Sequence, residues 1–203
     1  MNTLKGKLRN KFNSLVYRLA KFPLDNNLKH KIERIGNGYS FCMVPKNLLN
    51  KDSVVYSFSA GEDILSDVEL VKKHKCQVEI FDPTPKAIIH FEELIKNTNF
   101  GKKFYTDSNE TYQLSKLESK KLNLNKTALW KENSNLKFFV PKNSKHVSHS
   151  INNIQNTLEY IVVEAKKLST IMKELGHKHI DYLKLDIEGA EFEVINNIIK
   201  ENV

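Results

Sequence analysis

The chain has 203 residues, of which 40% are hydrophobic and 28% charged, so its composition is that of one soluble globular domain and excludes a disordered chain. Its 32 basic and 24 acidic residues give a net charge of +8, which favours anionic partners without identifying one. Cys42 and Cys76 are far apart and form no CxxC motif, so they indicate neither a zinc site nor a disulfide scaffold.

The sequence shows no signal-peptide pattern and no apolar run that approaches the length of a membrane span. We therefore expect a cytoplasmic protein.

Residues 3–22 have the pattern of a basic amphipathic helix. Apolar side chains recur at helical spacing at Leu4, Leu8, Phe12, Leu15 and Leu19, and no acidic residue precedes Asp25. Such a helix could make peripheral contact with an anionic membrane, or it could pack its apolar face onto the domain. Pro23 ends the helix. We assign residues 1–35 to this helix and a connector, and residues 36–203 to the main domain.

The first strong pattern after the turn at residues 36–38 and a short strand at 39–44 is a strand, a helix and a second strand. Residues 54–58 are β-branched and aromatic, residues 64–75 have helical character, and residues 77–81 form another short strand. This βαβ unit predicts a parallel sheet with a right-handed crossover.

The turn inside that unit favours a ligand with a nucleoside. Small residues at Ser59, Ala60 and Gly61 allow close approach of the backbone, and the helix that follows should offer free N–H groups. Asp82 lies about 20 residues further on at the tip of the second strand, where a carboxylate can accept hydrogen bonds from ribose hydroxyls. The full G-x-G-x-x-G spacing is missing, so a structural turn with Asp82 capping the next helix is the alternative interpretation.

The middle of the chain carries weaker patterns. We expect a helix at 85–94 and an irregular polar stretch at 97–121. Strands at 127–130 and 136–140 should form a hairpin around residues 131–135. Residues 141–150 should be a loop, whose His146 and His149 could serve acid–base chemistry or be solvated. A strand at 160–164 and a helix at 165–175, closed by Gly176, follow.

The stretch around which we organise the prediction lies near the C-terminus. A short apolar strand at 181–185 ends at Asp186, followed by Glu188, Gly189 and a helix at 191–200. Ligands of open α/β sheets bind at the carboxyl ends of the strands, which makes these carboxylates candidates for an active site. Carboxylates that merely favour the helix dipole are the alternative.

Four motifs together resemble the FkbM-type methyltransferases. They are VVYSFSAGED at 54–63, FDPTP at 81–85, VSHS at 147–150 and LKLDIEGAEFEV at 183–194. The resemblance runs from about residue 36 to the C-terminus. It implies a Rossmann-like α/β fold of the class I methyltransferases, with a mostly parallel sheet and flanking helices. It also implies S-adenosylmethionine as cofactor and O-methylation of a hydroxyl on a sugar, glycan or natural product.

The resemblance also assigns roles to individual residues. The cofactor's methionine part would lie beside Ser57, Phe58, Ser59 and Gly61, its ribose on Asp82, and its adenine against Ala128 and Leu129. Ser148, His149, Asp186 and Glu188 would form the acceptor side. Asp186 or His149 would act as the base that the hydroxyl needs, with Glu188 orienting it. No ligand spacing compels a metal.

The chain departs from the family pattern in two ways. Tyr56, Ser57 and Ser59 stand where many relatives have an acidic residue and glycines. The family usually continues with further strands and helices, whereas this sequence stops at Val203. We therefore expect a domain shortened at its C-terminus, with its last strand at a sheet edge, part of the acceptor pocket absent and a tendency to form homo-oligomers.

Other function classes have less support in the sequence than the methyltransferase. A nicotinamide-dependent oxidoreductase lacks support because the glycine fingerprint is incomplete and no Tyr/Lys catalytic pair is evident. A non-catalytic or truncated nucleotide-binding domain stays open. Nucleic-acid binding is not expected, because aromatic residues are not interleaved with the basic cluster.

Overall fold

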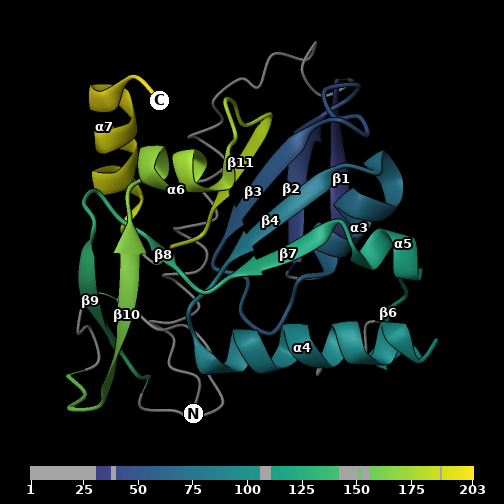
Figure 1. The fold of residues 1–203 in the computed structure, drawn as a ribbon, viewed down its shortest axis with the longest axis horizontal. Coiled ribbons are helices and arrows are strands. Elements are labelled where there is room, and N and C mark those ends of the chain that lie inside the picture. Colours follow the sequence, from purple (N-terminus) through teal and green to yellow (C-terminus); the bar gives the residue numbers. More distant parts are fainter. Residues whose placement is uncertain (1–30, 38–39, 106–110, 142–150, 152–155, 188) are drawn as a thin grey trace, which may run out of the picture.

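The computed structural model in Figure 1 describes residues 31–37, 40–105, 111–141, 151, 156–187 and 189–203. The amphipathic helix expected at 3–22 lies outside the described residues. So does most of the histidine-bearing loop, at 142–150.

A parallel sheet of four strands organises the described part of the chain, in the order β11-β3-β4-β7. Its strands are β3 (Val54–Phe58), β4 (Gln77–Phe81), β7 (Leu122–Asn125) and β11 (Tyr182–Leu185). The central strands β3 and β4 are buried at four consecutive positions each, the pattern of strands covered on both faces. Both span the predicted residues.

One face of this sheet is covered by helices and a hairpin. The elements are α3 (Leu65–His74), α4 (Pro85–Asn99) and the antiparallel pair β1 (Ile32–Asn37) and β2 (Ser40–Pro45). Val55, Val78 and Ile80 of the sheet form one core cluster with Val68 of α3 and Leu94 of α4. The hairpin is held over the sheet by Tyr182 of β11, whose hydroxyl donates to the Met43 carbonyl at 3.4 Å.

The other face packs against the C-terminal helices α6 (Leu168–Leu175) and α7 (Glu191–Glu201). Tyr56, Phe58 and Phe81 form its core with Ile171 and Val194. Helices on both faces of a parallel sheet make this a mixed α/β fold, which is compatible with a methyltransferase. Among the helices that the structure describes, none is long and apolar enough to cross a membrane.

A second sheet corrects the predicted hairpin. It contains β8 (Ala128–Leu129), β9 (Ser134–Phe139) and β10 (Tyr160–Lys166), in the order β8-β10-β9. β8 and β9 do not pair with each other, because each pairs with a different edge of β10, β8 in parallel and β9 antiparallel. Residues 131–135 contain no glycine for a tight turn, and β10 offers buried Val163 and Ala165 for packing.

Other boundaries also differ from the sequence prediction. Helix α6 starts at Leu168, because residues 165 and 166 still belong to β10. The stretch expected to be irregular contains the end of α4, a small pair β5 (Phe104–Tyr105) and β6 (Thr111–Tyr112), and α5 (Lys116–Ser119). Strand β7 was not predicted, and β1 begins within the expected connector.

Candidate functional site

A cleft of about 230 Å³ opens at the carboxyl ends of β3, β4 and β11. Its walls include seven of the residues predicted for the site: Phe58, Ser59, Gly61, Asp82, Ala128, Leu129 and Asp186. Ser57 does not line it, since the residue is completely buried, and its hydroxyl has no hydrogen-bond partner among the described residues. Ser148, His149 and Glu188 lie outside the described residues.

The turn after β3 is fixed against the end of β4. The Ser59 N–H donates to the Phe81 carbonyl at 3.0 Å, and the Gly61 N–H donates to Asp82 Oδ2 at 2.9 Å. Both turn residues have positive φ, 65° for Ser59 and 57° for Gly61. This region is costly for serine and easy for glycine, so the turn holds a strained residue at the cleft wall.

Asp82 is 4% exposed, and its carboxylate mainly accepts hydrogen bonds from other groups of the protein. Besides the Gly61 N–H, it accepts the Thr84 N–H at 2.9 Å and the Thr84 hydroxyl at 2.6 Å, both on Oδ1. A carboxylate offers about four acceptor positions, and three are occupied here. Asp82 therefore ties the β3 turn to the β4 end and keeps room for about one further donor rather than for two ribose hydroxyls.

The N–H groups at the start of α3 are also occupied, contrary to the expectation of free donors. Ile64 donates to the Tyr112 hydroxyl at 2.8 Å, and Leu65 donates to Asp63 Oδ1 at 3.1 Å. Ser66 donates to the Ser40 hydroxyl at 3.3 Å. Burial raises the pKa of Tyr112, and Asp63 raises it further, so the phenol stays neutral. Four backbone donors, counting Gly61, are thus unavailable to an anionic ligand.

Successive side chains of β11 point to opposite faces of the sheet. Leu183 and Leu185 pack into the cluster of Tyr56 and Phe58, whereas Lys184 and Asp186 line the cleft. Asp186 is exposed.

The turn that follows β11 is held by Glu191, whose carboxylate accepts the Ile187 N–H at 3.0 Å and the Gly189 N–H at 2.9 Å. Glu191 thus has a structural role, and Asp186 is the described carboxylate of this motif that faces the cleft.

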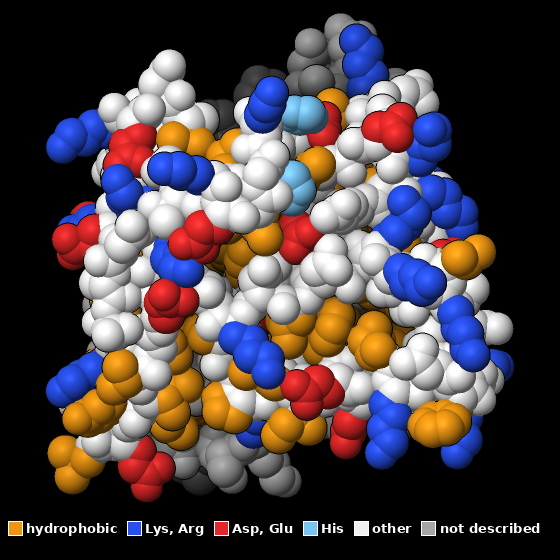
Figure 2. Space-filling model, in the orientation of Figure 1, with side chains coloured by type: hydrophobic (Ala, Val, Ile, Leu, Met, Phe, Trp, Pro, Cys, Tyr) orange, Lys and Arg blue, Asp and Glu red, His pale blue; other side chains and the backbone are white. Residues whose placement is uncertain are grey.

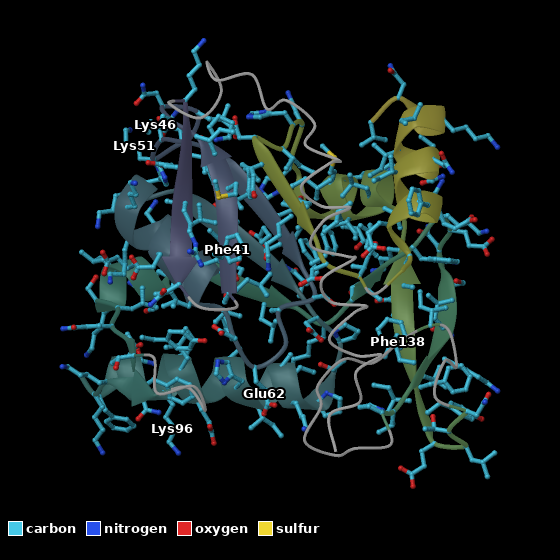
Figure 3. All side chains as sticks on the ribbon, turned by 180° about the vertical axis from the view of Figure 1, so that it is seen from behind. Phe41, Lys46, Lys51, Glu62, Lys96 and Phe138 are labelled. Atoms are coloured by element: carbon cyan, nitrogen blue, oxygen red, sulfur yellow. The ribbon has the colours of Figure 1, made fainter. Side chains whose placement is uncertain are left out.

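Two aromatic residues contributed by different sheets line the cleft as well. Phe41 lies on β2 and Phe138 on β9, and Figure 3 shows them well separated. The Arg34 guanidinium lies 4.2 Å from the centroid of the Phe41 ring. The Phe58 and Phe81 rings, which also line the cleft, stack with centroids 4.3 Å apart. Together with Ala128 and Leu129, these side chains make the cleft partly apolar, as a site for a flat ring requires.

A family model described as the methyltransferase FkbM domain matches residues 45–202. The chain belongs to the FkbM methyltransferase family. The resemblance inferred from the four motifs is thereby confirmed.

Two curated proteins are similar to this FkbM domain over a short stretch. Both are named "Probable methyltransferase-like protein 24", one from Rattus norvegicus and one from Homo sapiens. Each is 50% identical over 38 residues, which is 19% of this chain and 10% of the relative. The matched stretch is therefore a small part of those proteins. No solved structure matches the chain.

Several residues of the FkbM cleft were not predicted from the sequence, among them Ser40, Phe41, Glu62, Phe138 and Lys184. Lys184 could have been found, because it precedes Asp186 by two residues in a strand and so shares its face. Phe41 and Phe138 carried no such signal, since only the tertiary fold brings β2 and β9 to the ends of β3 and β4.

Proposed function

We propose that this FkbM domain is an S-adenosylmethionine-dependent methyltransferase that acts on a hydroxyl of a small-molecule, sugar or glycan acceptor. The carrying observation is the charge of the cleft. Among the described lining residues, the carboxylates are Glu62, Asp63, Asp82 and Asp186, and the single cation is Lys184. An acidic cleft suits a ligand with a sulfonium cation.

The occupied backbone donors and the charge of the cleft both disfavour a dinucleotide. The pyrophosphate of a nicotinamide cofactor is bound by free N–H groups at a helix N-terminus, and here the amides of Gly61, Ile64, Leu65 and Ser66 donate within the protein. Carboxylates nearby would also repel the two phosphates. The oxidoreductase is therefore the weaker alternative.

The residues present fit S-adenosylmethionine. Ala128 and Leu129 offer an apolar wall for the adenine, Asp82 keeps an acceptor position for a ribose hydroxyl, and the small Ala60 and Gly61 leave the turn accessible. When bound there, the cofactor would supply an electrophilic methyl group. The contribution of the protein would then be positioning, which can provide much of the acceleration of such a displacement.

Asp186 is our candidate for the base. It ends β11 at the cleft, and its carboxylate is exposed, so an acceptor hydroxyl can reach it directly or through one water. The carboxylate would take the hydroxyl proton as the oxygen attacks the methyl carbon and the bond from that carbon to sulfur breaks, which would leave a neutral thioether. His149 and Glu188, assigned to the acceptor side by the motif, stay part of the hypothesis.

The proposal is tested by transfer of a labelled methyl group from S-adenosylmethionine to a panel of sugars, glycans and phenols. We expect Asp186→Asn to slow transfer about a hundredfold or more, because general-base catalysis contributes factors of that order, while S-adenosylhomocysteine still binds. Asp52→Asn, at an exposed carboxylate before β3, is the matched control. Wild-type turnover of Asp186→Asn would remove Asp186 from the mechanism, and an inactive wild type that binds the cofactor would favour the non-catalytic alternative.

A further inference from the structure

Lys184 is the one cation among the described residues that line the cleft. It lies in the middle of β11, opposite Ser57 of β3 in the register of the sheet, rather than on a free loop. None of the ion pairs found within the described part of the chain involves Lys184. Most lysines that do form ion pairs there lie at the surface. A strand lysine that faces a cleft without a carboxylate partner is available to a ligand.

The hairpin of β1 and β2 covers the side of the sheet on which Lys184 lies. Burial raises the pKa of the Cys42 thiol on β2 to about 11, Asp67 adds to the rise, and Lys184 acts in the opposite direction. Leu183 and Leu185 pack toward α6 and α7, so the Lys184 side chain lies on the side of the sheet that β2 covers, where Ser40 and Phe41 also line the cleft. In such partly desolvated surroundings a charge-assisted hydrogen bond is stronger than at an open surface.

The order of the strands gives the direction of a ligand in the cleft. Asp82 marks the end of β4, the turn at Ser59 and Gly61 follows β3, and Lys184 belongs to β11, the next strand along the sheet. If the ribose of a ligand lies near Asp82 and the ligand extends across the β3 turn, its other end lies at β11. In S-adenosylmethionine that end is an amino acid, with a carboxylate and an ammonium group.

We propose that Lys184 binds the amino-acid carboxylate of the cofactor and so fixes the end of the ligand that lies farthest from the adenine. The inference rests on the proposed function. Asp186 on the same face supplies negative charge for the neighbouring ammonium and sulfonium groups. Glu62 in the β3 turn adds to it, although its carboxylate also pairs with Lys86 at 3.9 Å. Lysine and carboxylates together thus match a ligand end that carries both signs.

Calorimetric titration with two ligands tests the assignment. S-Adenosylhomocysteine carries the amino acid, and 5′-methylthioadenosine has the same adenosine and sulfur but no amino acid. We expect Lys184→Met to weaken S-adenosylhomocysteine binding about tenfold or more and to leave 5′-methylthioadenosine binding unchanged. Lys184→Arg should keep most of the affinity. Lys46→Met, at an exposed lysine that follows β2, is the control (Figure 3).

The outcomes separate this inference from the proposed function. A wild type that binds neither ligand contradicts the methyltransferase cofactor itself. If the wild type binds both and Lys184→Met leaves both affinities unchanged, the carboxylate assignment is wrong. The assignment is also wrong if the variant keeps its unfolding temperature but loses affinity for both ligands equally. It is wrong, too, if only the KM for the acceptor rises, since that result would place an anionic group of the acceptor on Lys184.

Discussion

Ser59 shows how a single residue shapes the cleft wall. Its N–H must reach the Phe81 carbonyl while the chain turns away from β3, and this requires the positive φ of 65°. For a residue with a Cβ atom, that region costs about 1–2 kcal/mol, whereas glycine adopts it freely. The strain lies at the site where the proposed cofactor passes.

We therefore expect Ser59→Gly to raise the free energy of unfolding. Relief of the strained φ should exceed the greater entropy of glycine in the unfolded chain, for a net gain of about 0.5–1 kcal/mol. Urea denaturation followed by circular dichroism measures the change, with the m-value as a check that the folded state is unaltered. A loss of stability would show that the Ser59 side chain makes a stabilising contact that outweighs its backbone strain.

Asp82 and Lys184 illustrate what sequence could and could not predict at the residue scale. The position of Asp82 at the cleft followed from its place at a strand tip, and its two bonds to Thr84 have the local pattern of an Asx turn, in keeping with the structural alternative for this residue. Its bond to the Gly61 N–H did not follow from the sequence, because it joins two turns 21 residues apart. Lys184 was not predicted, although strand alternation relative to Asp186 places it on the same face of β11. The acidic character of the cleft emerged only when β3, β4 and β11 were brought to one edge.

Among the elements, those with a strong local pattern were predictable. β3 and β4 combine β-branched residues with a clear turn, and the structure has them at 54–58 and 77–81. β7 alternates Leu with Asn, and its asparagines give it the look of a loop. They are explained by a neighbour, since Asn123 and Asn125 donate to the buried carboxylate of Glu79 at 2.9 and 2.8 Å. Such a partner in another strand is invisible to a local pattern.

Helix α5 provides a test at the scale of one element. The Glu118 N–H donates to the Ser115 hydroxyl at 3.2 Å, and the Ser115 N–H donates to the Glu118 carboxylate at 2.9 Å, which is a capping box. Lys75 donates to the same carboxylate at 2.7 Å. The Lys75 hydrogen bond, followed by that of the Ser115 N–H, lowers the pKa of Glu118 to about 2.

We expect Glu118→Gln to lower the free energy of unfolding by about 1 kcal/mol at pH 7, because glutamine can keep the capping box but loses the charge that pairs with Lys75. A carboxylate with a lowered folded pKa stabilises the protein fully above its ordinary pKa of 4.5, and this stability is lost as the pH falls through about 2. The difference between wild type and variant should therefore shrink from pH 5 to pH 2 in urea titrations. Glu159→Gln, at an exposed carboxylate before β10, is the control, and a difference independent of pH would contradict the assignment.

At the scale of the whole molecule, the charge of the surface and that of the cleft have opposite signs. Lysine and arginine side chains spread over the surface around α5 on the right of Figure 2, in keeping with the net charge of +8. The cleft, by contrast, is lined by carboxylates. A basic exterior suits an anionic partner, whereas an acidic cleft suits the cationic cofactor that we propose.

Two features favour self-association. Among the described strands β11 has a neighbour on one side only, and α7 exposes Phe192 at 82% and Ile199 at 71%. Replacing both α7 residues by glutamine should shift the protein toward monomer in light scattering, because it removes exposed apolar area. Leu117→Gln on α5, where the leucine is 76% exposed, is the matched control and should leave the mass unchanged. A wild type that is monomeric at high concentration would contradict the prediction.

We propose that the cleft at the ends of β3, β4 and β11 binds a cofactor with a sulfonium cation and an adenosine. Calorimetric titration of the wild-type protein with S-adenosylmethionine, S-adenosylhomocysteine and NAD tests it most directly. We expect saturable one-to-one binding of the first two ligands, weakened more than tenfold by Asp82→Asn, and no binding of NAD. Binding of NAD with comparable affinity, or binding of none of the three, would contradict the account.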